Sequence, residues 1–162
     1  MIEGLDVVIV RSPLVYGPGV KGNLLALLRL CDSPWPLPFG ALHNRRSFVH
    51  VDDLARLLID CATHPQAAGR MYFAAHERSV STRELVAGIR SALPRPARLF
   101  AASPRALEAV AALAGQRERM ARLTRSLEVD GSDAARELGW TAQVGFETAL
   151  DDMVGAYRGS IE

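Results

Sequence analysis

The chain has 162 residues, 49% of them hydrophobic and 23% charged, and its 19 basic and 18 acidic side chains leave a formal net charge of +1. This length suits one domain with a sizeable core, and the charge balance gives no field favouring nucleic acid or an acidic membrane, so we expect neither partner. No apolar run approaches the roughly 18 residues of a membrane span. Cys31 and Cys61 lie in apolar helical patterns, which fits buried thiols in a reducing cytoplasm.

The first half of the chain predicts alternating strands and helices. Residues 5–11 form the first expected strand, and the unbroken run Val7–Val10 indicates burial on both faces. The Pro- and Gly-rich residues 12–22 predict a loop. A helix over 23–31, a short strand over 47–51 and a helix over 51–64 follow. The apolar spacing in the last helix predicts a buried face made of Val51, Leu54, Ala55, Leu58, Cys61 and Ala62.

The second half is richer in helices. After a strand over 69–75, Ser81 and Glu84 have capping-box spacing and open a helix to about residue 93. A short strand over 98–101 precedes a helix that starts at Ser103-Pro104 and is interrupted at Gly115. Helices over 132–138 and 146–158 complete an α/β chain, and no linker divides residues 1–162 into two domains.

Three segments together resemble one family. VVIVRSPLVYGPG (7–19), RRSFVHVDDLARLL (45–58) and SLEVDGSDAARELGWTAQVGFETALDDMVGAY (126–157) are similar to the extended short-chain dehydrogenases/reductases, within the NAD-dependent epimerase/dehydratase family that acts on nucleotide sugars. The pattern is most like a UDP-sugar 4-epimerase. The resemblance implies the C-terminal part of a Rossmann-like fold with a small helix-rich substrate-binding subdomain.

The same resemblance implies which parts of such an enzyme are missing. The family's catalytic pair is Tyr-x-x-x-Lys, but the single lysine, Lys21, follows Gly17 by four residues, so we expect no catalytic residue here. Pro18 stands among Gly17, Gly19 and Gly22 after the first strand, and we expect their intervals not to form the G-x-G-x-x-G spacing of a glycine-rich NAD loop. We therefore expect residues 1–162 to be the C-terminal, substrate-binding half, inactive alone. NAD would serve the complete enzyme without binding this chain tightly.

The resemblance also assigns two arginines to the substrate diphosphate. Arg46 precedes the Phe-x-His-Val strand, where a guanidinium fork suits phosphate oxygens. Among Arg119, Arg122 and Arg125 we select Arg122 as the second, although a solvated helix face is the slightly favoured interpretation of any one of them. Arg45 should point away from the site.

Other expected contacts follow the family pattern. Asn23 and Leu24 match residues that border the nucleotide base, and Leu37 and Phe39 match a segment that lines a uracil pocket; a plain N-cap and core packing are the alternatives. Ser12 and Pro13 follow the first strand and would face the cofactor. Leu14 departs from a polar residue of some sugar epimerases.

A histidine followed by two carboxylates, His50 with Asp52 and Asp53, admits a metal or acid–base pair, but we favour a strand histidine followed by a helix N-cap. Tyr16 is expected to pack beneath its loop rather than to catalyse.

Three functions remain open. The first is the UDP-sugar-binding portion of an NAD-dependent epimerase or dehydratase, which could be a homodimer when complete. The alternatives are a reductase of a non-nucleotide substrate from the same superfamily and a non-catalytic sugar-nucleotide-binding module. Arg46 discriminates between the first two, because a phosphate-free ligand has no use for a buried arginine fork.

Overall fold

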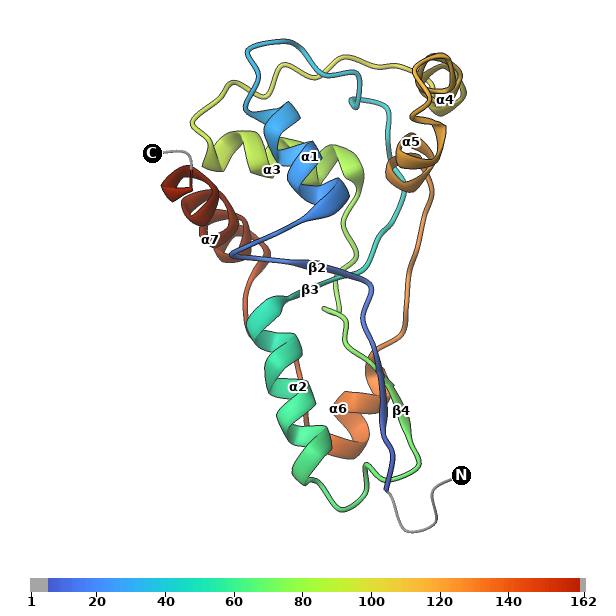
Figure 1. Ribbon diagram of the computed structural model, residues 1–162, viewed down its shortest axis with the longest axis vertical. Helices are drawn as coiled ribbons and strands as arrows, with labels where there is room; N and C mark the ends of the chain where they lie inside the picture. The colour runs from blue at the N-terminus through green and yellow to red at the C-terminus, as the bar shows by residue number, and fades with distance from the viewer. Residues whose placement is uncertain (1–5, 161–162) are drawn as a thin grey trace.

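The computed structural model describes residues 6–160 and contains two groups of elements (Figure 1). One end holds strands β1 (Ile9–Arg11) and β4 (Met71–Phe73) with helices α2 (Val51–Thr63) and α6 (Ser132–Leu138). The other holds helices α1 (Gly22–Cys31), α3 (Thr82–Ala92) and α7 (Phe146–Gly159), beside the hairpin of α4 (Pro104–Leu113) and α5 (Arg117–Thr124). Strands β2 (Leu14–Tyr16) and β3 (Phe48–His50) lie between the two ends.

The strands form two parallel pairs. In the first, β1 pairs with β4, and Ile9 lies opposite Met71. In the second, β2 pairs with β3, and Leu14 lies opposite Phe48. Each strand is three residues long, so most of the buried apolar surface comes from the helices packed on the strands.

Two apolar cores stabilise the two ends. The core beneath α2 and α6 is built around Leu57, Tyr72 and Trp140, each at most 5% exposed. The larger core lies among α1, α3 and α7, and its fully buried members include Leu28, Ile89 and Met153. No helix within residues 6–160 is both long and apolar enough to cross a membrane.

Local capping signals are confirmed. The Ser81 side chain accepts from the Glu84 N–H while the Glu84 carboxylate accepts from the Ser81 N–H, which completes the capping box of α3. Ser103 caps α4, and Gly115, with φ of 67°, separates α4 from α5. Gly139 ends α6 in the left-handed conformation.

The two cysteines are buried as expected, and burial raises the pKa of the Cys31 thiol to about 12.

Three predictions of the first half are wrong. The expected loop over 12–22 contains β2, because parallel pairing with β3 outweighs the flanking Pro and Gly. The first strand is shorter than expected and covered on one face: Val8 and Val10 pack on the lower core, whereas Val7 and Ile9 are about half exposed. Residue Leu5 lies outside the described residues.

The buried face of α2 also differs from the prediction. Asp53, Leu57 and Cys61 are buried, whereas Leu58 is 49% exposed. The apolar residues of this helix fit more than one stripe, and the hydrogen bonds of the Asp53 carboxylate select the stripe that faces inward.

Candidate functional site

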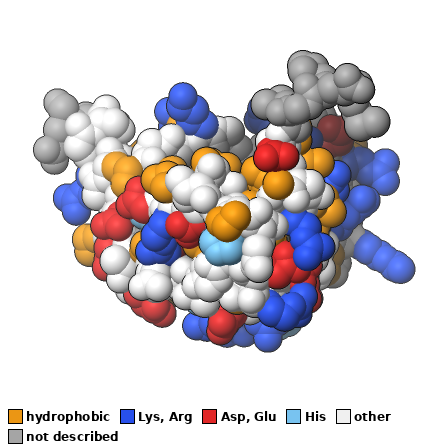
Figure 2. Space-filling view, turned by 90° about the horizontal axis from the view of Figure 1, so that it is seen from below, with side chains coloured by type: hydrophobic (Ala, Val, Ile, Leu, Met, Phe, Trp, Pro, Cys, Tyr) orange, Lys and Arg blue, Asp and Glu red, His pale blue; other side chains and the backbone are white. Residues whose placement is uncertain are grey.

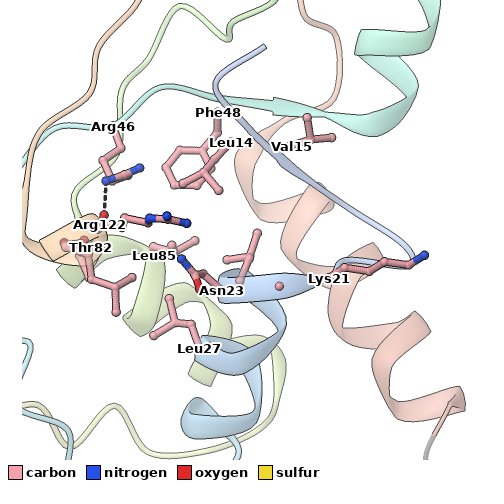
Figure 3. A pocket seen from close by; sticks show the side chains of 13 residues that line it. Leu14, Val15, Lys21, Asn23, Leu27, Arg46, Phe48, Thr82, Leu85 and Arg122 are labelled. Atoms are coloured by element: carbon pink, nitrogen blue, oxygen red, sulfur yellow. Dashed lines mark hydrogen bonds between the residues drawn. The ribbon is translucent and has the colours of Figure 1, made fainter. Parts of the chain in front are cut away.

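A cavity of about 330 Å³ opens where the first turns of α1 and α3 meet β2, β3 and the end of α5 (Figure 3). Its volume is that of a small-molecule site rather than a macromolecular interface. The lining residues are Leu14, Val15, Lys21, Gly22, Asn23, Leu24, Leu27, Arg46, Phe48, Thr82, Leu85, Arg122 and Leu123.

Arg46 is the charged group at the polar end of this cavity. Its side chain is 8% exposed, and Nη1 donates to the carbonyls of Arg122 and Arg125. Within residues 6–160 no carboxylate lies within 4.0 Å of the guanidinium, and Nε has no hydrogen-bond partner. Burial lowers the pKa of Arg46, because it penalises the charged form. A desolvated cation without a counter-ion favours binding of an anion.

Arg122 adds a second positive charge beside Arg46 (Figure 3). It is exposed and comes from the last turn of α5, and its side chain makes no ion pair within the described residues. An open groove of about 610 Å³ continues past both arginines along α5 and includes Arg117 and Arg125. Arg119 lines neither space, so the structure distinguishes it from Arg122 on the same helix.

The first turn of α1 forms another polar part of the wall. Lys21 is its N-cap residue and makes no side-chain capping bond, so the first N–H groups of the helix lack a side-chain acceptor. The Asn23 amide makes no hydrogen bond within the described part of the chain, and it lies beside Arg122 in the cavity (Figure 3). These donors and the helix dipole favour negative charge at this end of α1.

The remaining walls are apolar. Leu14, Leu27, Phe48 and Leu85 surround the space in Figure 3 and offer flat or aliphatic faces to a ring. Thr82 is the exception, but its hydroxyl already donates to the Leu123 carbonyl at 2.6 Å. One end of the cavity is therefore cationic, and the rest is hydrophobic.

Four residues that were expected from the sequence line this cavity: Asn23, Leu24, Arg46 and Arg122. It does not bring Leu37 and Phe39 there, since both side chains are buried in the larger core at 2% and 1% exposure. Ser12 and Pro13 join β1 to β2 and also lie outside the cavity lining. Arg45 is exposed and pairs with Glu84, away from the cavity as expected.

Sequence reasoning missed Lys21, Thr82 and Phe48 as lining residues. Lys21 could have been suspected as the single lysine directly before a helix. No local signal indicates that the first turn of α3, which carries Thr82, meets the first turn of α1, because the two are about sixty residues apart in the chain.

Two members of the histidine–carboxylate cluster make structural contacts. His50, rather than Asp52 or Asp53, is the N-cap of α2: its Nδ1 accepts from the Asp52 N–H at 3.4 Å. The buried Asp53 carboxylate accepts from the N–H groups of Gln143 and Val144 at 3.1–3.2 Å. Within residues 6–160 no group of three or more His, Cys, Asp or Glu side chains could hold a metal ion.

Tyr16 is 3% exposed and packs against Phe48, His50 and Phe146. Burial raises its pKa to about 12, which fits a packing role.

The expectation about the glycine-rich loop needs a correction. Gly17, Gly19 and Gly22 do have the G-x-G-x-x-G spacing, and they lie between β2 and α1. Their backbone nevertheless departs from the dinucleotide-binding pattern, in which the third glycine lets the helix pack closely on the strand. Here Gly22 has φ of 62°, and a Cβ added there would meet nothing within 4 Å. These residues therefore do not fit the pyrophosphate of NAD as that motif does.

Figure 2 views the end formed by α2 and α6 and shows acidic and basic side chains mixed with small apolar areas. By contrast, Arg46 and Arg122 lie together at one end of the cavity.

Comparison with known proteins agrees with this fold. Residues 2–75 match the NAD dependent epimerase/dehydratase family. Over 150 residues the chain is 37% identical to UDP-glucose 4-epimerase of Vibrio cholerae, an alignment that takes in 90% of this chain and 46% of that relative.

Two solved structures overlay on nearly the whole chain. UDP-glucose 4-epimerase of Thermotoga maritima, solved with UDP-glucose, has a TM-score of 0.70 at 20% identity, covering 99% of this chain and 48% of its own. The dTDP-glucose 4,6-dehydratase DesIV of Streptomyces venezuelae, solved with NAD, has a TM-score of 0.70 at 25% identity, covering 98% of this chain and 45% of its own. The chain spans about half the length of these proteins.

The fold is therefore the α/β fold of the Rossmann-like short-chain dehydrogenases. Within that class, the match over residues 2–75 and the 37% identity to the Vibrio cholerae relative make the chain similar to the NAD-dependent epimerase/dehydratase family.

Proposed function

We propose that this chain supplies the nucleotide-sugar-binding portion of an NAD-dependent nucleoside-diphosphate-sugar epimerase or dehydratase, similar to a UDP-sugar 4-epimerase. The observation that carries the proposal is Arg46, a nearly buried cation without a carboxylate partner among residues 6–160, at the polar end of an apolar cavity. The bound partner would be a UDP-sugar or a related nucleotide sugar.

The chemistry of the cavity suits a nucleoside diphosphate. The two negative phosphates of such a ligand would supply the counter-charge that Arg46 and Arg122 lack. Each charge-assisted hydrogen bond to them would contribute about 1.5–3 kcal/mol. A planar base would pack against Phe48 or the leucine walls. A phosphate-free substrate would leave the buried Arg46 charge unpaired, which disfavours the reductase alternative.

In this proposal residues 1–162 are the C-terminal, substrate-binding half of a longer enzyme, which forms a homodimer when complete. Binding energy from the nucleotide, remote from the reacting sugar carbon, would orient the sugar for the chemical step.

NAD supplies hydride chemistry in this family, and the dehydratase neighbour was solved with NAD. The residues described here do not fit its pyrophosphate, and the sequence holds no Tyr-x-x-x-Lys pair. We therefore assign this chain no catalytic residue and expect it to be inactive alone. Ser12 and Pro13, after β1, would contact the cofactor from its edge.

The test is titration calorimetry with UDP, comparing Arg122→Ala with the matched control Arg119→Ala. Both arginines are exposed on α5, but only Arg122 lines the cavity, and its structural contact uses the main-chain carbonyl, which the substitution retains. We expect Arg122→Ala to weaken UDP binding about tenfold and Arg119→Ala to leave it within about twofold.

A titration with NAD should give no measurable heat of binding. Equal effects of the two α5 variants, or NAD binding without UDP binding, would refute the assignment of the cavity to a nucleoside diphosphate.

A further inference from the structure

Asn44, in the segment before β3, uses its whole side-chain amide to join two walls of the cavity without lining it. Its Nδ2 donates to the carbonyls of Leu123 and Arg125, each at 3.0 Å, and its Oδ1 accepts from the Thr82 N–H at 3.1 Å. Because the Thr82 N–H needs an acceptor and the two carbonyls need donors, these partners fix the orientation of the amide.

The first wall is the end of α5. The last carbonyls of a helix have no partner within the helix, and here side chains from elsewhere in the chain satisfy them. Asn44 and Thr82 both bind the Leu123 carbonyl, while Arg46 binds those of Arg122 and Arg125. Since α5 carries no fully buried side chain, these polar contacts add to the packing of Met120 and Leu123 in holding its end.

The second wall is the first turn of α3. Thr82 is 1% exposed and begins that helix, and Asn44 accepts from its N–H. One amide therefore spans from the start of α3 to the end of α5, which lie about forty residues apart in the chain. Asn44 binds the carbonyl of Leu123, and Leu123 directly follows Arg122 in α5.

We propose that Asn44 is a positioning residue for ligand binding: it holds the end of α5 so that the Arg122 guanidinium faces the same space as Arg46. This inference rests on the proposed function of the cavity. Asn44 itself touches no ligand, and its effect on affinity passes through Arg122.

The test is a double-mutant cycle on UDP affinity, measured by titration calorimetry with Asn44→Ala, Arg122→Ala and the double variant. We expect Asn44→Ala to weaken binding about fivefold alone but less than about twofold when Arg122 is already alanine, because its main effect is then gone. A merely structural role would give the same factor in both backgrounds, and that result would overturn the proposal.

Two further variants sharpen the cycle. Asn44→Asp keeps the acceptor for the Thr82 N–H but sets a carboxylate against two carbonyl oxygens, so we expect a loss at least as large as that of Asn44→Ala. The matched control is His43→Ala, an exposed neighbour in the same segment that should retain wild-type affinity. If Asn44→Ala does not fold by far-UV circular dichroism, Asn44→Ser, which supplies a shorter hydroxyl in place of the amide, takes its place in the cycle.

The outcomes separate this inference from the proposed function. If Arg122→Ala leaves UDP affinity unchanged, the assignment of the cavity fails. If Arg122→Ala weakens binding while the folded Asn44 variant binds like the wild type, the cavity assignment stands and the role of Asn44 is wrong.

Discussion

Replacing Arg90 by methionine should destabilise the chain strongly, although Arg90 lies away from the cavity. Its side chain is 1% exposed at the end of α3, and its guanidinium donates to the carbonyls of Ser33, Trp35 and Pro96 at 3.1, 2.6 and 3.0 Å. These bonds hold the segment after α1 and the segment after α3 to the same helix. Methionine fills much of the same volume but donates no hydrogen bond.

The expected magnitude follows from these contacts. Hydrogen bonds to a charged group contribute about 1.5–3 kcal/mol each, and burying the guanidinium charge offsets several kcal/mol of that gain. Trp35 and Pro96 are exposed, so water can reach part of the freed carbonyls. We therefore expect the free energy of unfolding to fall by about 3–5 kcal/mol, and the melting temperature by roughly 6–20 °C for a domain of this size.

The assay is urea denaturation followed by circular dichroism and by tryptophan fluorescence. Trp35 is 73% exposed and its carbonyl is a partner of Arg90, whereas Trp140 is buried in the other core, so the two tryptophans report on different ends of the chain. Arg83→Met, an exposed arginine of the same helix, is the control and should change stability by less than about 0.5 kcal/mol. An Arg90→Met variant within about 1 kcal/mol of wild type would refute the reasoning.

Two further predictions concern α3 and its contacts. Gly88→Ala should lower thermal stability, because a Cβ there would lie 2.4 Å from the Leu150 Cδ1. Gly155→Ala on α7, where an added Cβ would meet open space, should raise stability by about 0.5–1 kcal/mol. Equal shifts in melting temperature for the two variants would contradict this packing. Hydrogen bonds from Ser81 lower the pKa of Glu84 below its usual 4.5, so its contribution to stability is present above that pH and is lost as the pH falls. Glu84→Gln should therefore flatten the acid side of the stability profile in urea titrations, and an unchanged profile would show that Glu84 carries no such linkage.

The sequence predicted those elements whose signals are local. Caps such as Ser81 and Ser103 act within one helical turn, so they can be recognised without knowing the fold. Strand β2 could not be found in this way, because three residues become a strand only by pairing with β3, more than thirty positions later. The buried face of α2 depends on Asp53, whose main-chain donors, the N–H groups of Gln143 and Val144, lie about ninety residues away.

The same difference between local signals and tertiary packing applies to the candidate site. Asn23, Leu24, Arg46 and Arg122 follow from the family resemblance and line one cavity, and their roles in ligand binding stay predictions. Leu37 was expected at the base pocket, but its burial in the core is decided by tertiary packing.

Because the chain has a single lysine, a residue that lines the cavity can be labelled selectively. Lys21 is exposed, lines the cavity, and is the single lysine among 162 residues. Apart from the amine at the start of the chain, it is therefore the one primary amine that an acylating dye can reach. A fluorophore attached there would stand at the mouth of the cavity, so that ligand entry could be followed by emission in the unmutated protein.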